Sequence, residues 1–242
     1  MRTRVEAIDR RAFVRMTAIA GATLFSGFMI AGCSQQTTET EPAEEPSEES
    51  NLEANAADAT APQQANQLVA YFSCPEPTGV DTVAGASRVV VENQLYGNVE
   101  YVASLIQEHT GADVFVVDTV QEYPADHDEL IEFAVAEMDA GTLPELAEPI
   151  ADISSYDRIF LGYPIWNAQL PMPVRSLLEG VDLSGKAVVC FTVHGGSGFG
   201  GTIDQVRAAE PSADITEGFS VSRNSVGGVA SDVASWLNSL PY

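Results

Sequence analysis

The sequence predicts an α/β protein: a doubly wound, five-stranded parallel sheet over residues 67–242, preceded by an N-terminal segment without a fold of its own. Two observations predict this architecture. From Gln67 onward, short apolar runs alternate with stretches of helical periodicity, which is typical of a parallel sheet covered by helices on both faces. The chain before Gln67 lacks this alternation, although hydrophobic residues make up 45% of the whole and suffice for a core.

The first half of the predicted domain holds two strands and two helices. Leu68 to Phe72 is a short apolar run typical of a buried strand, and Val114 to Val117 is predicted to be the next strand. The helix between them ends near Gly111, because glycine is a common helix C-cap, and the next helix covers Asp126 to Ala140. The expected core-facing residues are Val99, Val102, Ala103 and Ile106 in the first helix and Leu130, Phe133, Ala134 and Met138 in the second.

The second half continues the alternation. Strands are predicted at Arg158 to Tyr163, Lys186 to Val193 and Ile215 to Val221, with short helices near Pro173 to Leu178 and at about Thr202 to Ala209. A last helix carries an apolar stripe formed by Val229, Val233, Trp236, Leu237 and Leu240. In such a sheet, ligands bind beyond the carboxyl ends of the strands, so the loops that follow the strands are the candidate sites.

Residues 1–32 have the features of an export signal. They contain five arginines and two acids, a local charge of +3, and an apolar run from Met16 to Ala31 that is short for a membrane span. The stretch from Asp9 to Arg15 resembles a twin-arginine signal, and Ile30 to Cys33 resembles a bacterial lipobox. We therefore expect Cys33 to be lipidated and to anchor the exported protein on the outer face of a bacterial membrane. An apolar helix with two chance arginines is the alternative.

Residues 33–66 are predicted to form an acidic, disordered tether. Between Ser34 and Asn66 the chain has eight acids, no base and no aromatic residue. Such a segment buries too little apolar surface to offset the entropy lost on ordering.

The overall charge excludes several classes of protein. With 11 basic and 35 acidic residues, the formal charge of −24 argues against nucleic-acid binding, which needs clustered lysine and arginine. The same acidity disfavours docking on anionic lipid through a basic face.

Three cysteines and three histidines without zinc-ligand spacing leave no recognisable metal site and no disulfide framework.

Three strand-end loops carry candidate chemistry. Ser73 is followed by about two dozen inserted residues and then by Tyr96 to Val99, which opens a helix. A hydroxyl and free N–H groups at a helix start can hold a phosphate without lysine, although an ordinary capped loop is the alternative.

The second loop, Tyr163 to Pro171, places two large aromatic residues beside prolines, which suits stacking on a planar ligand or, alternatively, covering the sheet edge. The third loop, His194 to Gly201, contains five glycines, which permit close approach of the main chain to a ligand. A merely flexible connection is the alternative for this loop.

Six short motifs are distributed along the domain: Tyr71-Phe72-Ser73, Gly97-Asn98, Tyr123-Pro124-Ala125-Asp126, Leu161-Gly162-Tyr163-Pro164-Ile165-Trp166, Leu170-Pro171-Met172-Pro173-Val174-Arg175 and His194-Gly195-Gly196-Ser197-Gly198. Together they resemble a flavodoxin-like family of FMN-binding domains, over about 175 residues from Gln67 to Leu240. The resemblance implies strand order 2-1-3-4-5, with FMN as cofactor at the switch point.

The resemblance also implies roles for particular residues. The phosphate of FMN would be held by Ser73, Gly97, Asn98 and Val99. The isoalloxazine ring would be flanked by Tyr163, Pro164, Ile165, Trp166 and Asn167, and its pyrimidine side lined by His194, Gly195, Gly196 and Ser197. The implied function is electron transfer to redox partner proteins or small-molecule acceptors, with no catalytic residue beyond the cofactor.

The sequence departs from the family pattern within the first loop. The family motif Ser-x-Thr-Gly-Asn-Thr is interrupted here by Cys74 to Tyr96, and Val99 stands where a threonine is expected, unless Thr78 supplies that hydroxyl. Arg88, the first basic residue after the signal, either pairs with the phosphate or is a surface arginine. Asn167 stands where many relatives carry a second tryptophan, which would leave the flavin more exposed.

Other sequence motifs and functions provide alternatives. Gly196 to Gly201 matches a dinucleotide-binding fingerprint but follows the fourth strand rather than the first. A serine hydrolase motif around Ser197 fails because Phe199 replaces its last glycine. An FMN-dependent quinone or small-molecule reductase and a non-catalytic surface binding lipoprotein remain alternatives. Cys74 and Cys190 are predicted to be free thiols because their strands are not expected to be adjacent.

Overall fold

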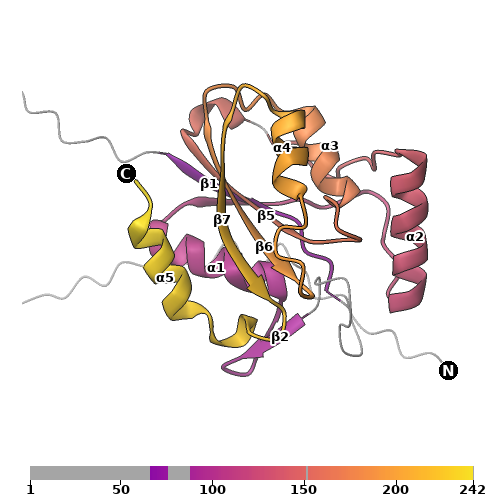
Figure 1. The fold of residues 1–242 in the computed structure, drawn as a ribbon, viewed down its shortest axis with the longest axis horizontal. Coiled ribbons are helices and arrows are strands. Elements are labelled where there is room, and N and C mark those ends of the chain that lie inside the picture. Colours follow the sequence, from indigo (N-terminus) through magenta and orange to yellow (C-terminus); the bar gives the residue numbers. More distant parts are fainter. Residues whose placement is uncertain (1–65, 76–87, 151, 242) are drawn as a thin grey trace, which may run out of the picture. The chain divides into compact units, whose positions relative to one another are not determined.

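The computed structural model describes residues 66–75, 88–150 and 152–241 and confirms the predicted fold class. Five parallel strands form one sheet in the order β4-β1-β5-β6-β7, which is 2-1-3-4-5 along the chain (Figure 1). The strands are β1 (Gln67–Tyr71), β4 (Asp113–Val116), β5 (Arg158–Pro164), β6 (Ala187–His194) and β7 (Asp214–Ser222). The predicted signal, the tether up to residue 65 and Thr78 lie outside the described residues.

In the described residues, four α-helices connect these strands and a fifth follows β7, and several of their ends follow local capping rules. They are α1 (Asn98–Thr110), α2 (His127–Ala140), α3 (Met172–Gly180), α4 (Thr202–Ala209) and α5 (Ala230–Ser239). Helices α1 and α2 both end at a left-handed glycine, Gly111 and Gly141, and the Asp126 carboxylate accepts two N–H groups at the start of α2. No helix in the described ranges is long and apolar enough to cross a membrane.

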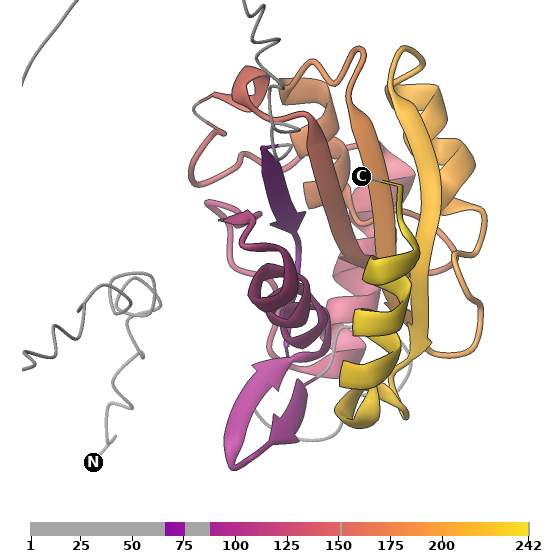
Figure 2. The same cartoon turned by 90° about the vertical axis from the view of Figure 1, so that its left-hand side faces the viewer.

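The sheet separates two hydrophobic clusters, because successive residues of each buried strand face opposite sides. Helices α1 and α5 lie side by side on one face, and α2, α3 and α4 cover the other (Figure 2). Strand β1 shows the division: Leu68, Ala70 and Phe72 pack toward α2 and α3, whereas Val69 and Tyr71 pack toward α1. The central strands β1, β5 and β6 therefore read as continuous apolar runs, as parallel strands buried on both faces do, whereas the edge strands β4 and β7 are largely exposed.

A β-hairpin that the sequence analysis missed lies inside the predicted insertion. Strands β2 (Arg88–Val91) and β3 (Gln94–Gly97) are antiparallel and joined by Glu92 and Asn93, both with positive φ. Two β-favouring runs separated by two residues, one of them asparagine, are a hairpin signal that could have revealed it.

One core prediction was wrong and the thiol prediction is confirmed. Phe133 is 37% exposed, because it lies at the rim of α2 and meets Tyr123 edge to face instead of entering the core. Cys74 and Cys190 form no disulfide bond in the described part of the chain. Cys190 is fully buried in β6, and burial raises the pKa of its thiol to about 12.

Candidate functional site

The candidate site lies at the carboxyl edge of the sheet, where the three predicted loops come together. Strands β1, β5 and β6 are parallel neighbours, so the segments that follow them emerge at the same edge (Figure 1). The segment after β4, the other neighbour of β1, adds Tyr123 to this edge. Residues far apart in the chain thus meet at the switch point of the strand order.

The first part of the site is a narrow cradle between Ser73 and the start of α1. Gly97 is the N-cap of this helix, and a Cβ atom added to it would lie 2.4 Å from the Ser73 hydroxyl oxygen. That hydroxyl is buried and has no hydrogen-bond partner among the described residues. A buried hydroxyl without a partner, next to a helix N-terminus kept open by glycine, suits an anion.

Three further residues shape this helix start. Asn98 and Val99 are both buried, and the Val99 side chain packs into the core on the α1 face, so a contact from Val99 to a ligand would come from its main chain. The Gly97 N–H donates to a carboxylate oxygen of Glu100 at 2.8 Å, a residue to which sequence reasoning gave no role. An acidic residue in the first helical turn is a common capping signal.

The second part of the site is a tight turn after β5. Trp166 and Gln169 exchange two main-chain hydrogen bonds, of 3.2 and 2.8 Å, across Asn167 and Ala168. Both central residues have positive φ, 48° and 58°, which non-glycine residues seldom adopt. The turn leaves Asn167 exposed at the edge of the site.

The aromatic side chains of this loop are buried. Trp166 is only 3% exposed, and its ring meets those of Phe72 and Tyr123 edge to face, with centroids 5.3 and 5.4 Å apart. Tyr163 is fully buried with its hydroxyl 3.1 Å from that of Thr202, and Pro164 and Ile165 are buried too. Any contact of Tyr163 with a ligand has to come from its main chain.

The buried carboxylate of Glu137 fixes the position of Tyr123 in this aromatic cluster. The Tyr123 hydroxyl donates to one oxygen of Glu137 at 2.8 Å, and the Gln121 side-chain amide donates to the other at 2.6 Å. Glu137 is 7% exposed, and burial together with this hydrogen bond raises the pKa of Tyr123 well above its usual range. Tyr123 therefore stays protonated as a fixed donor, a role that its motif alone did not reveal.

The third part of the site is the glycine-rich loop after β6. The Gly196 N–H donates to Nδ1 of His194 at 2.9 Å, and burial lowers the pKa of this imidazole. Gly195, Gly196 and Ser197 are exposed. A Cβ atom on Gly200 would lie 3.3 Å from Ile165 and 3.4 Å from the Ala168 Cα atom, so this loop packs against the turn after β5.

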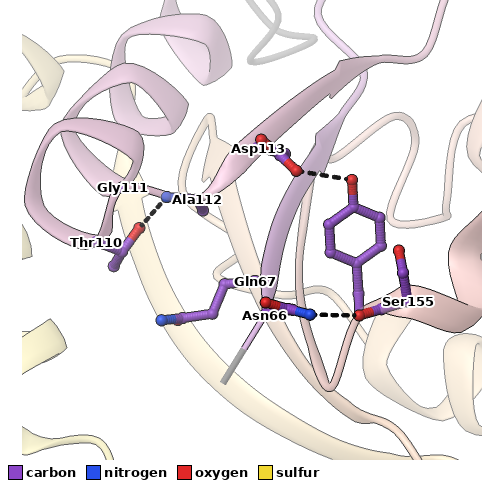
Figure 3. Close-up of a pocket in the computed structure, with 8 residues that line it drawn as sticks. Asn66, Gln67, Thr110, Gly111, Ala112, Asp113 and Ser155 are labelled. Atoms are coloured by element: carbon purple, nitrogen blue, oxygen red, sulfur yellow. Dashed lines mark hydrogen bonds between the residues drawn. The ribbon is translucent and has the colours of Figure 1, made fainter. Parts of the chain in front are cut away.

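A hollow of about 500 Å³ lies at the opposite, amino edge of the sheet (Figure 3). Its lining residues are Asn66, Gln67, Thr110, Gly111, Ala112, Asp113, Ser155 and Tyr156. Several of their polar groups bond to one another: Tyr156 donates to Asp113 at 2.9 Å, and Asn66 to the Ser155 carbonyl at 3.0 Å. None of the predicted site residues lines this hollow, so the hollow and the candidate site are at different ends of the sheet.

Comparison with known proteins identifies the family. The family described as Flavodoxin matches residues 87–240 of this chain. The chain belongs to the flavodoxin family. The match includes the hairpin, the start of α1 and both loops after β5 and β6. No curated protein matches the chain.

Solved structures share the flavodoxin fold. A protein of Bacteroides eggerthii described as a flavoprotein is 24% identical, with a TM-score of 0.55 over 72% of this chain and 96% of its own. One of Bacteroides uniformis with the same description is 20% identical, with a TM-score of 0.56 over 73% and 99%. A flavoprotein of Lactobacillus acidophilus in complex with FMN is 16% identical, with a TM-score of 0.49 over 72% and 99%.

Proposed function

We propose that this flavodoxin binds FMN and transfers electrons at the outer face of a bacterial membrane, to which lipidated Cys33 anchors it. The observation that carries the proposal is the cradle at the start of α1. There the buried Ser73 hydroxyl lacks a partner among the described residues, and it lies 2.4 Å from where a Cβ atom of Gly97 would be, so it reaches the helix start only because residue 97 is glycine. Membership in the flavodoxin family supports a flavin phosphate as the anion at this position.

The three loops contact different parts of FMN in this proposal. Ser73 and the main-chain N–H groups of Asn98 and Val99 hold the phosphate, whereas Gly97, whose N–H donates to Glu100, contributes by lacking a side chain. The turn at Asn167 and the loop from His194 to Ser197 flank the ring, with main-chain N–H groups toward its polar edge. When bound, FMN supplies one- and two-electron transfer, whereas the chain sets its position, exposure and potential.

The charge of the domain bears on that potential. Residues 67–242 contain 6 basic and 25 acidic residues, a formal charge of −19. This negative field opposes the charge that a flavin gains on reduction, so we expect a midpoint potential below that of free FMN. A redox titration that gives a potential at or above the free value would contradict this part of the proposal.

Purification tests the binding proposal directly. The protein is expected to be yellow with flavin absorbance, or to take up added FMN one to one. A colourless preparation that refuses FMN would refute it. Steady turnover with a nicotinamide donor and a quinone would instead identify a reductase, because an electron carrier needs a protein partner to turn over.

The anchor is tested by fractionation. Cys33→Ser removes the thiol that lipidation requires, so the protein is expected to move from the membrane fraction to the soluble exported fraction. Replacement of both Arg10 and Arg11 by lysine is expected to block export of the folded protein. Unchanged membrane association of the Cys33 variant would overturn the lipid anchor.

A further inference from the structure

The hairpin that interrupts the first loop places an arginine beside the cradle. Strands β2 and β3 pair so that Arg88 lies directly opposite Gly97, the residue at which α1 begins. Both strands of the hairpin contact α1 (Figure 2). The hairpin therefore leads the chain into the start of α1, and Arg88 is the residue that pairs with Gly97 across the two strands.

The pairing register fixes the side from which Arg88 projects. Residues directly opposite in an antiparallel pair project from the same face, with Cβ atoms about 4.5–5.5 Å apart. The Cβ direction of Gly97 points at the Ser73 hydroxyl, at 2.4 Å. The Cβ atom of Arg88 is therefore within roughly 8 Å of that hydroxyl, a distance that an arginine side chain spans.

The two faces of the hairpin differ in composition. Val89, Val91 and Tyr96 pack on the core beside α1 and α5. The face that carries Arg88 otherwise holds Val90 and Leu95, which are 66% and 57% exposed. Arg88 is thus the one charged side chain on the face of the β2–β3 ladder that continues into the cradle.

The electrostatics of the cradle favour a cation beside the phosphate. A bound phosphate ester carries a charge between about −1 and −2 near neutral pH. The Glu100 carboxylate already occupies the Gly97 N–H at the same helix terminus, so a phosphate there meets a like charge. Arg88 is the first basic residue after Arg15, and the next is Arg158 at the amino end of β5.

We propose that Arg88 binds the flavin phosphate and makes the site selective for FMN over riboflavin. This inference rests on the proposed function. In this arrangement the inserted hairpin brings the planar, permanently charged guanidinium of Arg88 to the phosphate. The guanidinium offsets the charge of Glu100, and its fork of N–H groups matches two phosphate oxygens.

The test compares two ligands that differ only in the phosphate. Apoprotein of the full chain is titrated with FMN and with riboflavin, following the quenching of flavin fluorescence. Arg88→Gln is expected to weaken FMN binding about tenfold or more and to leave riboflavin binding unchanged, because it removes a charge-assisted hydrogen bond to a phosphate that riboflavin lacks. Arg88→Lys, which keeps the charge but loses the fork, is expected to fall between the two proteins.

Arg158→Gln is the matched control. It removes the same charge from the domain, but its guanidinium bonds to the Pro241 carbonyl at the amino end of the sheet. It is expected to leave the ratio of FMN to riboflavin affinity unchanged. An equal loss for both ligands in Arg88→Gln, or no loss for FMN, would overturn the role of Arg88. Wild-type protein that binds neither ligand would instead refute the proposed function.

Discussion

The two halves of the candidate site are built in opposite ways. The phosphate side depends on an absence: Gly97 has no side chain, and the Ser73 hydroxyl beside it is buried without a partner among the described residues. The ring side depends on packing: Trp166, Phe72 and Tyr123 interlock, and Glu137 holds Tyr123 in place. A small group added at Gly97 should therefore weaken FMN binding, whereas changes in the ring-side cluster should lower the free energy of unfolding.

The largest effect is expected from Gly97→Ala. The new Cβ atom would sit 2.4 Å from the Ser73 hydroxyl, in the space that the phosphate needs, although the extended backbone of Gly97 accepts alanine without strain. FMN affinity is expected to fall at least about a hundredfold, or ~2.7 kcal/mol. The control is Gly180→Ala at the end of α3, where an added Cβ atom meets nothing within 4 Å. Equal FMN affinity in the two variants would show that the phosphate does not bind beside Gly97.

Tyr123→Phe tests the packed half. The change leaves one oxygen of the buried Glu137 carboxylate without its donor, and we expect the free energy of unfolding to fall by about 1–3 kcal/mol. Tyr156→Phe is the matched control, because that phenol donates to an exposed carboxylate, Asp113, at a similar distance. Its cost is expected to stay below about 1 kcal/mol. Urea denaturation measures both, and Trp166 emission should shift only in the Tyr123 variant.

Ser73→Ala should move binding and stability in opposite directions. Removing a buried hydroxyl that has no partner among the described residues is expected to stabilise the apoprotein by about 1 kcal/mol. The same change removes a donor to the phosphate and should weaken FMN binding about tenfold. Thermal unfolding of the apoprotein and FMN titration measure the two quantities. A variant that loses stability would show that the hydroxyl serves the fold instead of the ligand.

The smallest effect concerns pH and the loop after β6. Burial lowers the pKa of His194 in the folded state, so the unfolded chain binds the proton more readily. Stability should therefore fall as the pH drops below the ordinary value of 6.5, until the lowered pKa is reached. Protonation also removes the acceptor for the Gly196 N–H. His194→Gln keeps an acceptor without titrating, so its stability should change less between pH 7.5 and 5.5 in urea denaturation.

The sequence predicted the fold more fully than it predicted the site. Strand and helix ranges follow from local periodicity and capping residues such as Asp126 and Gly111, which the structure uses as expected. Phe133 was assigned to the core because periodicity does not show where a helix face reaches the rim. Of the ring-side loop, the sequence identified Trp166 but not that its ring is buried, since burial depends on Phe72 and Tyr123 from the segments after β1 and β4.

The sequence by itself determined the alternation of elements, the excess of acidic charge and the glycine at the start of α1, because these depend on neighbouring residues and on composition. Only the tertiary structure decided which side chains meet. Parallel strands bring the loops after β1, β4, β5 and β6 to one edge, and the hairpin register places Arg88 opposite Gly97. Such contacts depend on strand order and register, which are set by the packing of the whole sheet.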